Sequence, residues 1–181
     1  TTCNIMAISQ ANSDQVEQAL KMLSETSVDV IYLVDSYGSL YPENASEFAK
    51  IYLKAVEGTN KKIGFHAHNN QNLAFANTIE TLSYGVSFLD ATVQGMGRGA
   101  GNCAMELLLG FLKNPKYNIY SLLQFIEKYM LSMKEQGVVW GYDLQYMFTG
   151  LLNRHPREAI DFTNSKRNDY FEFYKGLLDN Y

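Results

Sequence analysis

The chain has 181 residues, 46% of them hydrophobic and 19% charged, which suits one packed domain rather than a disordered or fibrous chain. A net charge of −4 with no basic stripe makes nucleic acid and anionic membrane surfaces poor candidate partners. Two cysteines are too few for a disulfide framework, and no run of roughly eighteen apolar residues is present. We therefore expect a cytoplasmic protein that acts on small molecules or other proteins.

Two strand–helix units open the chain. Residues 3–8 form an apolar run that predicts a buried strand, and Ser13 is a candidate N-cap for a helix over 15–23. A second apolar run at 29–35 predicts a strand, and Pro42 suits the first turn of the helix after it.

The third strand, over residues 63–68, carries the chemistry. Side chains alternate along a strand, so His66 and His68 point to the same side and can bind one metal ion. The plainer alternative is that both are ordinary polar residues at the end of a strand. Helical spacing follows over 73–82, and Gly85 predicts the end of that helix. The alternation of strands and helices indicates a parallel sheet.

A glycine-rich loop follows the fourth strand, which is predicted over residues 86–91. Glycines at every second position of the loop 95–102, among them Gly97, Gly99 and Gly101, can present backbone N–H groups to a substrate carboxylate or phosphate. A dinucleotide-binding fingerprint is rejected because no acidic residue follows roughly twenty residues later. A tight turn would explain one or two of these glycines but not the whole set.

The rest of the chain predicts helices. Asn102 is a candidate cap for a helix through 105–112, and Ser121 for one through 133. Three aromatic-rich helices are expected over 141–152, 157–162 and 169–178.

Several motifs together resemble one family. The run Phe-His-Ala-His-Asn-Asn at 65–70, with the segments at 73–77, 89–92 and 95–102, is similar to the last strands of the metal-dependent pyruvate aldolase and lyase superfamily. That superfamily includes hydroxymethylglutaryl-CoA lyase, 2-isopropylmalate synthase and 4-hydroxy-2-oxovalerate aldolase. Residues 34–40 resemble the aldolase branch most closely, and the resemblance covers nearly the whole chain, more loosely after residue 114.

The resemblance implies an α/β fold, the eight-stranded TIM (β/α)₈ barrel. Residues 1–113 match only its C-terminal half, strands 5–8, and residues 114–181 would form a helical C-terminal region. Because the sequence begins with Thr1 rather than Met, we expect that the start of a longer chain is missing.

The resemblance also implies a metal site. His66 and His68 would be metal ligands, and Asn102 would lie near the metal, directly or through water, among the substrate-binding residues with Gly97, Gly99 and Gly101. The family's third ligand, an aspartate, belongs to the first strand, which is not matched here. Imidazole and oxygen ligands suit Mn²⁺ first, then Mg²⁺, and they admit Co²⁺ or Zn²⁺.

The implied reaction is the metal-dependent cleavage or formation of a carbon–carbon bond in a 4-hydroxy-2-oxo acid, from pyruvate and an aldehyde. The bound cation would stabilise the enolate of the 2-oxo acid. A tyrosine of the helical region would reach over the barrel mouth. Tyr146 is the candidate, with Tyr142 close behind, and aromatic packing is the plain alternative for both.

Other polar residues have structural explanations. Asp35 and Asp90 at strand ends are expected to support neighbouring loops more than to act chemically. Cys103 lies outside the position of the lyase branch's catalytic cysteine, which disfavours acyl-CoA lyase chemistry. His155 is expected to be a surface or interface residue rather than a ligand.

Two classes of function remain open. The first is an aldolase, or a relative with synthase-like or lyase-like acyl-CoA chemistry. The second is a non-catalytic half-barrel that only binds or assembles. Open sheet edges predict a homo-oligomer, and the aldolase branch implies an aldehyde dehydrogenase partner.

Overall fold

The protein, seen in a computed structural model, is described over residues 1–113 and 116–179. Four parallel strands form one sheet in the order β1-β2-β3-β4. The strands are β1 (Thr2–Ile5), β2 (Val30–Asp35), β3 (Lys62–Ala67) and β4 (Phe88–Leu89). Each strand is joined to the next by a helix, which confirms the predicted parallel α/β pattern.

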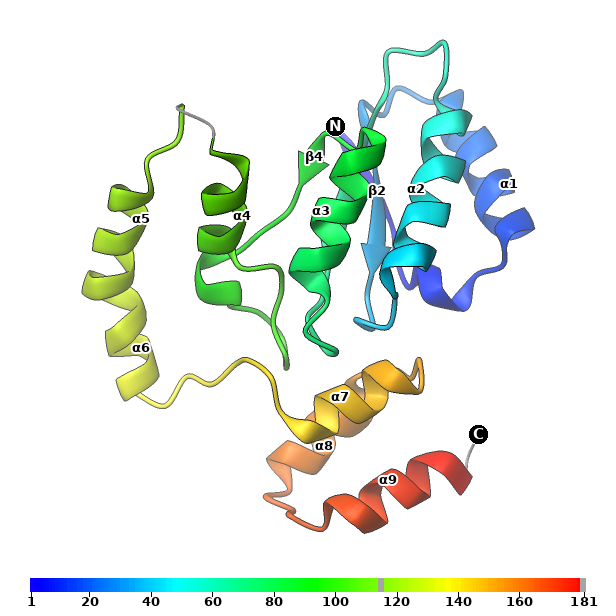
Figure 1. Ribbon diagram of the computed structural model, residues 1–181. Coiled ribbons are helices and arrows are strands. Elements are labelled where there is room, and N and C mark those ends of the chain that lie inside the picture. The colour runs from blue at the N-terminus through cyan, green and yellow to red at the C-terminus, as the bar shows by residue number, and fades with distance from the viewer. Residues whose placement is uncertain (114–115, 180–181) are drawn as a thin grey trace.

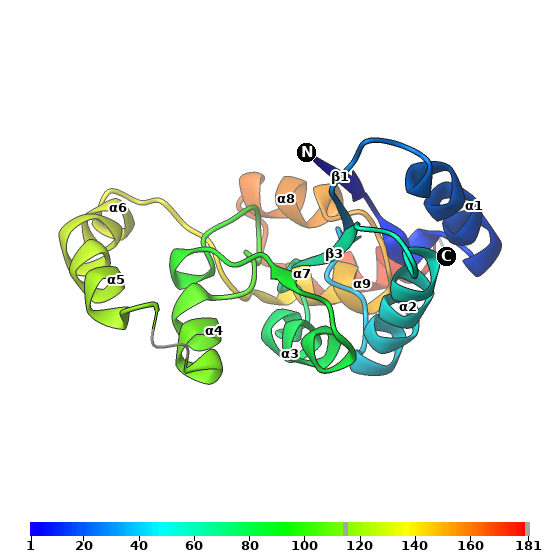
Figure 2. The same ribbon diagram turned by 90° about the horizontal axis from the view of Figure 1, so that it is seen from above.

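Three helices cover one face of the sheet (Figures 1 and 2). They are α1 (Ser13–Ser24), α2 (Pro42–Ala55) and α3 (Ala74–Tyr84). Ile31, Leu33, Ile63 and Phe65 are almost fully buried against them. Since alternate residues of a strand face opposite sides, His66 of β3 is kept off this apolar layer.

The opposite face carries a different row of side chains. Asn4, Tyr32, Gly64 and Phe88 are matched in register across the four strands, so they point to the same side. Phe88 is 44% exposed and Met6, just beyond β1, is 61% exposed. The face opposite the helices is therefore partly open within the described part of the chain.

Two predicted strands are shorter than expected. β1 ends at Ile5 rather than at residue 8, because Ala7 takes a left-handed conformation (φ 52°) and its N–H donates to Ser36 Oγ at 2.8 Å. A 3₁₀ turn, η1 (Ile8–Gln10), follows. β4 pairs only over two residues instead of the predicted 86–91.

Helix ends differ in detail from the sequence predictions. Asn12, not Ser13, caps α1 by a reciprocal capping box with Gln15. Pro42 does begin α2, and Gly85 (φ 110°) does end α3, as predicted. Asn102 does not cap α4 (Met105–Leu112), whose N-cap is Ala104.

The next helical segment is α5 (Ile119–Phe125), capped by Asn118 rather than opened by Ser121. A π-helical stretch, η3 (Ile126–Met130), separates it from α6 (Leu131–Glu135). Residue 114, at the expected domain boundary, lies outside the described residues.

Three further helices lie beneath the carboxyl ends of the strands (Figure 1). They are α7 (Leu144–Leu151), α8 (Arg157–Asn164) and α9 (Tyr170–Asp179), close to their predicted positions. Asn153 joins them to the sheet, since Ser39 Oγ donates to its Oδ1 at 2.9 Å and its Nδ2 donates to Ser9 O at 2.8 Å. Among the described helices, none is long and apolar enough to cross a membrane.

Candidate metal and substrate site

His66 and His68 lie side by side where β3 ends. His66 belongs to the strand, and His68 follows one residue after it, in an isolated bridge with Asn102. Their ring centroids are 5.1 Å apart, and the rings are inclined at 70°. One ion can contact both rings at this separation, since a metal–imidazole bond is about 2.1 Å long.

Each imidazole has its Nδ1 engaged by an oxygen acceptor. Nδ1 of His66 is 3.0 Å from Asp90 Oδ2, and Nδ1 of His68 is 3.1 Å from the backbone oxygen of Asp35. A carbonyl oxygen can only accept, and the Asp90 carboxylate also accepts, so both Nδ1 atoms are assigned as N–H donors. The lone pair of each neutral ring is then on Nε2, the atom free to bind a metal.

His68 is kept neutral by its surroundings. Burial lowers its pKa to about 4, and its electrostatic interactions with the neighbouring His66 ring and with the positive charge of Arg98 lower it further. A neutral imidazole is the form that coordinates metal, so proton competition at His68 is weak near neutral pH.

A tyrosine that the sequence analysis overlooked supports Asp90. The ring of Tyr32 lies over Gly64, where a Cβ would come within 2.5 Å of Tyr32 Cε1. Burial and the neighbouring Asp90, which it also hydrogen-bonds, raise the pKa of Tyr32 to about 12. Tyr32, Asp90 and His66 thus form a chain of contacts across three strands. Only the strand register brings these residues together.

Asn102 places an oxygen without a partner beside the histidines' strand. Its Nδ2 donates to Met96 O at 3.2 Å, while its buried Oδ1 has no hydrogen-bond partner among the described residues. The adjoining Gly101 O accepts from Asn69 N at 2.9 Å, which ties this segment to the end of β3. Gly97 lies against the Asn102 amide, where a Cβ would come within 2.5 Å of Nδ2. An unpaired amide oxygen is a fitting ligand for a hard cation.

The remaining loop glycines allow close packing. At Gly99 (φ 58°) a Cβ would come within 2.8 Å of the Tyr146 ring, and at Gly101 (φ 82°) within 2.1 Å of Gly95 O. Tyr146, on α7, is therefore in contact with the glycine-rich loop, and Thr163 Oγ1 is 3.4 Å from its hydroxyl. Tyr142 is 51% exposed. Within the loop, the N–H of Gly101 donates to Arg98 O at 3.0 Å. This N–H therefore stabilises the turn.

Asp35 and Cys103 are buried beside the site. The Asp35 carboxylate accepts from the backbone N–H groups of Ser39 (3.0 Å) and Leu40 (3.2 Å), so it shapes the loop after β2. Burial nevertheless raises the pKa of Asp35 to about 6. Burial also raises the pKa of the Cys103 thiol, which disfavours a nucleophilic thiolate there.

The site has two imidazole nitrogens, and the residue bridged to His68, Asn102, carries an amide oxygen without a hydrogen-bond partner among the described residues. Among the described residues no group of three His, Cys, Asp or Glu side chains could hold a metal ion. The donor set fits a hard or borderline divalent cation that keeps open positions for substrate oxygens.

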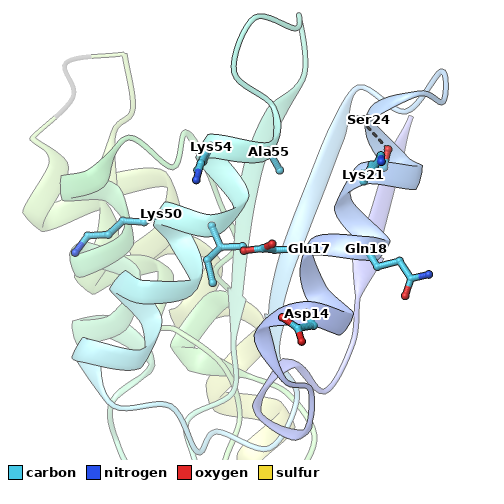
Figure 3. A pocket seen from close by; sticks show the side chains of 9 residues that line it. Asp14, Glu17, Gln18, Lys21, Ser24, Lys50, Lys54 and Ala55 are labelled. Carbon is cyan, nitrogen blue, oxygen red and sulfur yellow. Dashed lines mark hydrogen bonds between the residues drawn. The ribbon is translucent and has the colours of Figure 1, made fainter.

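A surface groove lies elsewhere. It has a volume of about 700 Å³ and lies between α1 and α2 on the outer helical layer (Figure 3). Charged side chains of both signs line it, including Asp14, Glu17, Lys21 and Lys54. Since it lies on the helical layer and lacks the histidines, it is a groove between neighbouring helices rather than the candidate site.

The chain is similar to known proteins. Residues 1–131 match the family model described as HMGL-like. The chain is 40% identical over 118 residues to 4-hydroxy-2-oxovalerate aldolase of Thermus thermophilus, covering 63% of this chain and 33% of that protein. It is 41% identical over 101 residues to oxaloacetate decarboxylase of Mycobacterium tuberculosis, covering 55% of this chain and 29% of that one.

A solved structure shows the same fold. The N-terminal domain of a "putative aldolase" from Bacteroides vulgatus superposes with a TM-score of 0.75 at 31% identity, covering 90% of this chain and 54% of that one. The chain thus spans about a third of the length of the curated relatives it matches.

Proposed function

The chain belongs to the HMGL-like family, and we propose that it carries the metal-binding part of a divalent-metal-dependent aldolase acting on 4-hydroxy-2-oxo acids. The observation that carries this proposal is the pair His66 and His68, with each Nδ1 hydrogen-bonded and each Nε2 without a hydrogen bond to any residue that the structure describes. The names of the curated relatives, which are aldolases and a decarboxylase, support the reaction class.

His66, His68 and the unpaired Oδ1 of Asn102 would hold the cation, with Mn²⁺ preferred and Mg²⁺, Co²⁺ or Zn²⁺ as alternatives. The cation would supply a Lewis acid for the keto oxygen of a 2-oxo acid. Asp90 would keep the His66 ring in its ligating tautomer, in the way that carboxylates orient metal-bound histidines generally.

Gly97, Gly99 and Gly101 would bring the loop backbone close to the substrate, with Asn102 at its end. Tyr146 would be the catalytic residue, exchanging a proton with the hydroxyl oxygen at C4 of the substrate. Its contact with Gly99 supports this role over that of the exposed Tyr142.

The chain would form strands 5–8 of a TIM barrel, with residues 1–113 in the barrel and 114–181 as the helical region. The partly open sheet face supports a homo-oligomer or another complementary chain segment. An aldehyde dehydrogenase partner is proposed from the resemblance to the aldolase branch. Free thiols at Cys3 and Cys103 suit the proposed reducing cytoplasm.

Two alternatives remain. Acyl-CoA chemistry like that of 2-isopropylmalate synthase or hydroxymethylglutaryl-CoA lyase would use the same metal ligands. A non-catalytic half-barrel would bind or assemble without turnover.

The test is to follow pyruvate release from 4-hydroxy-2-oxopentanoate by the Mn²⁺-loaded full chain, using lactate dehydrogenase and NADH. We expect Mn²⁺-dependent release that falls at least a hundredfold in His66→Ala. Tyr146→Phe should lower kcat and leave Mn²⁺ affinity unchanged. Mn²⁺ binding without any pyruvate release would contradict the aldolase and favour the non-catalytic alternative.

A further inference from the structure

Two consecutive backbone carbonyl groups at the end of β2 each accept a hydrogen bond from a side chain. The backbone oxygen of Asp35 accepts from His68 Nδ1 at 3.1 Å, and the backbone oxygen of Ser36 accepts from Arg98 Nη2 at 3.1 Å. Because adjacent residues hold them, the guanidinium of Arg98 lies next to the His68 imidazole. A cation is thus fixed beside the candidate metal site.

The next residue of the same loop, Tyr37, contacts a third side chain, that of His155. The Tyr37 and His155 rings meet edge-on, with centroids 5.4 Å apart. Burial is the largest cause that lowers the pKa of His68 and of His155. The positive charge of Arg98 lowers both pKa values further. Arg98, held at Ser36 O, is therefore within electrostatic reach of both His68 and His155.

Arg98 lacks a negative partner in the part of the chain that the structure describes. Its side chain is exposed and forms no ion pair with any described carboxylate. A single hydrogen bond to Ser36 O fixes one nitrogen of the guanidinium fork, which has five N–H donors in all. Its other donors can therefore take an anion.

His155 can add a second donor. Its Nδ1 accepts from Arg157 N at 3.1 Å, which places the proton of the neutral ring on Nε2. Partial burial and the charges of Arg98 and Arg157 lower the pKa of His155, so the ring is mostly neutral at pH 7. Arg98 with a neutral imidazole offers about one positive charge, which matches a carboxylate better than a phosphate dianion.

We propose that Arg98 and His155 form a subsite for the far carboxylate of a 2-oxo dicarboxylic acid whose 2-oxo acid group lies at His66 and His68. The proposal rests on the proposed function and narrows its substrate class. It makes Arg98 a specificity-determining residue rather than a clamp for the glycine-rich loop.

The test compares ligands of equal length in the Mn²⁺-loaded full chain, by water-proton relaxation of the bound Mn²⁺. 2-Oxoglutarate and 2-oxoadipate are each paired with the monocarboxylate of the same length, 2-oxopentanoate and 2-oxohexanoate. We expect at least one dicarboxylate to bind about tenfold more tightly than its partner, equivalent to about 1.4 kcal/mol.

Arg98→Met should remove this preference and leave monocarboxylate binding unchanged, whereas Arg98→Lys should keep part of it because the charge remains. Lys21→Met, on the exposed surface of α1, is the matched control and should keep the full preference. If Arg98→Met fails to fold, Arg98→Lys together with His155→Phe carries the same comparison.

A preference that survives in Arg98→Met would overturn the subsite, as would an equal loss of both ligand types, which indicates a loop clamp. Monocarboxylate binding without any preference in the wild type would overturn the subsite alone. Absence of Mn²⁺ binding would overturn both the subsite and the proposed function.

Discussion

At the scale of single residues, the candidate site depends on which nitrogen of each imidazole carries the proton. Asp90 fixes this for His66, and the backbone oxygen of Asp35 fixes it for His68. Asp90 also adds negative charge, which makes the His66 ring a stronger ligand. A side chain therefore orients His66, and a backbone oxygen orients His68. Only the Asp90 contact of His66 can be removed by substituting the acceptor's side chain.

We predict that Asp90→Asn weakens Mn²⁺ binding by about ten- to a hundredfold, because the neutral amide can no longer raise the basicity of His66. Calorimetric titration measures the change. Asp14→Asn, on the exposed surface of α1, is the control and should bind like the wild type. An unchanged affinity in Asp90→Asn would show that the His66 contact does not tune the ligand.

We predict that Gly99→Ala lowers the free energy of unfolding by roughly 1–3 kcal/mol, since an alanine at φ 58° is strained and its Cβ would press on the Tyr146 ring. Gly110→Ala in α4 is the matched control: an added Cβ there meets nothing within 4 Å. The control should be neutral or slightly stabilising. Urea unfolding measures both variants, and equal stabilities would refute the packing role of Gly99.

The sequence predicted part of this residue-scale picture. His66 and His68 could be paired because strand alternation is visible in the sequence. The contact between Tyr32 and Asp90 could not be predicted from the sequence. It depends on the register of β2, β3 and β4, and on Gly64, which has no side chain to displace the Tyr32 ring.

At the scale of elements, the loop after β2 organises the site, and Asp35 organises that loop. Its carboxylate is 1% exposed and accepts backbone N–H groups of Ser39 and Leu40. Burial raises the pKa of Asp35, whereas these hydrogen bonds lower it. Burial has the larger effect, since the pKa is raised to about 6. The loop is therefore more stable with Asp35 protonated.

We predict that Asp35 makes stability fall as pH rises from about 4 to about 6. In that window the folded protein binds more protons at Asp35 than the unfolded chain does. Relative to Asp35→Asn, the wild type should lose at most roughly 3 kcal/mol of unfolding free energy across it. Urea unfolding at pH 4 and pH 7 measures the difference, and parallel pH profiles of the two proteins would contradict it.

Element types were predictable, whereas several ends were not. Apolar runs and Gly85 marked the strands and the end of α3. β1 stops early because Ala7 donates to Ser36 Oγ, a contact between residues 29 positions apart that no local pattern reveals.

At the scale of the whole molecule, one sheet face is covered by helices and the other is partly open. α7 lies beneath the carboxyl ends of the strands (Figure 1), where Tyr146 contacts Gly99 of the glycine-rich loop and His155 contacts Tyr37 of the loop after β2. The sequence predicted these helices but not where they dock, because the docking contacts of Asn70 and Asn153 are hydrogen bonds to residues far away in the sequence.

We predict that the chain self-associates through the open face, since Phe88 and Met6 expose apolar surface there. Sedimentation velocity should show a species heavier than the monomer at high concentration. Phe88→Gln should shift it towards monomer, whereas Phe171→Gln, which alters an exposed residue on α9, should not. A wild-type monomer at every concentration would contradict this.

The most direct test of the account is a Mn²⁺ titration of the wild type beside His66→Ala and His68→Ala. We predict one Mn²⁺ per chain, with at least tenfold weaker binding in each alanine variant and no change in the α1 surface control Gln18→Ala. Binding that is unaffected by both histidine substitutions would contradict the proposal that these two imidazoles share one cation.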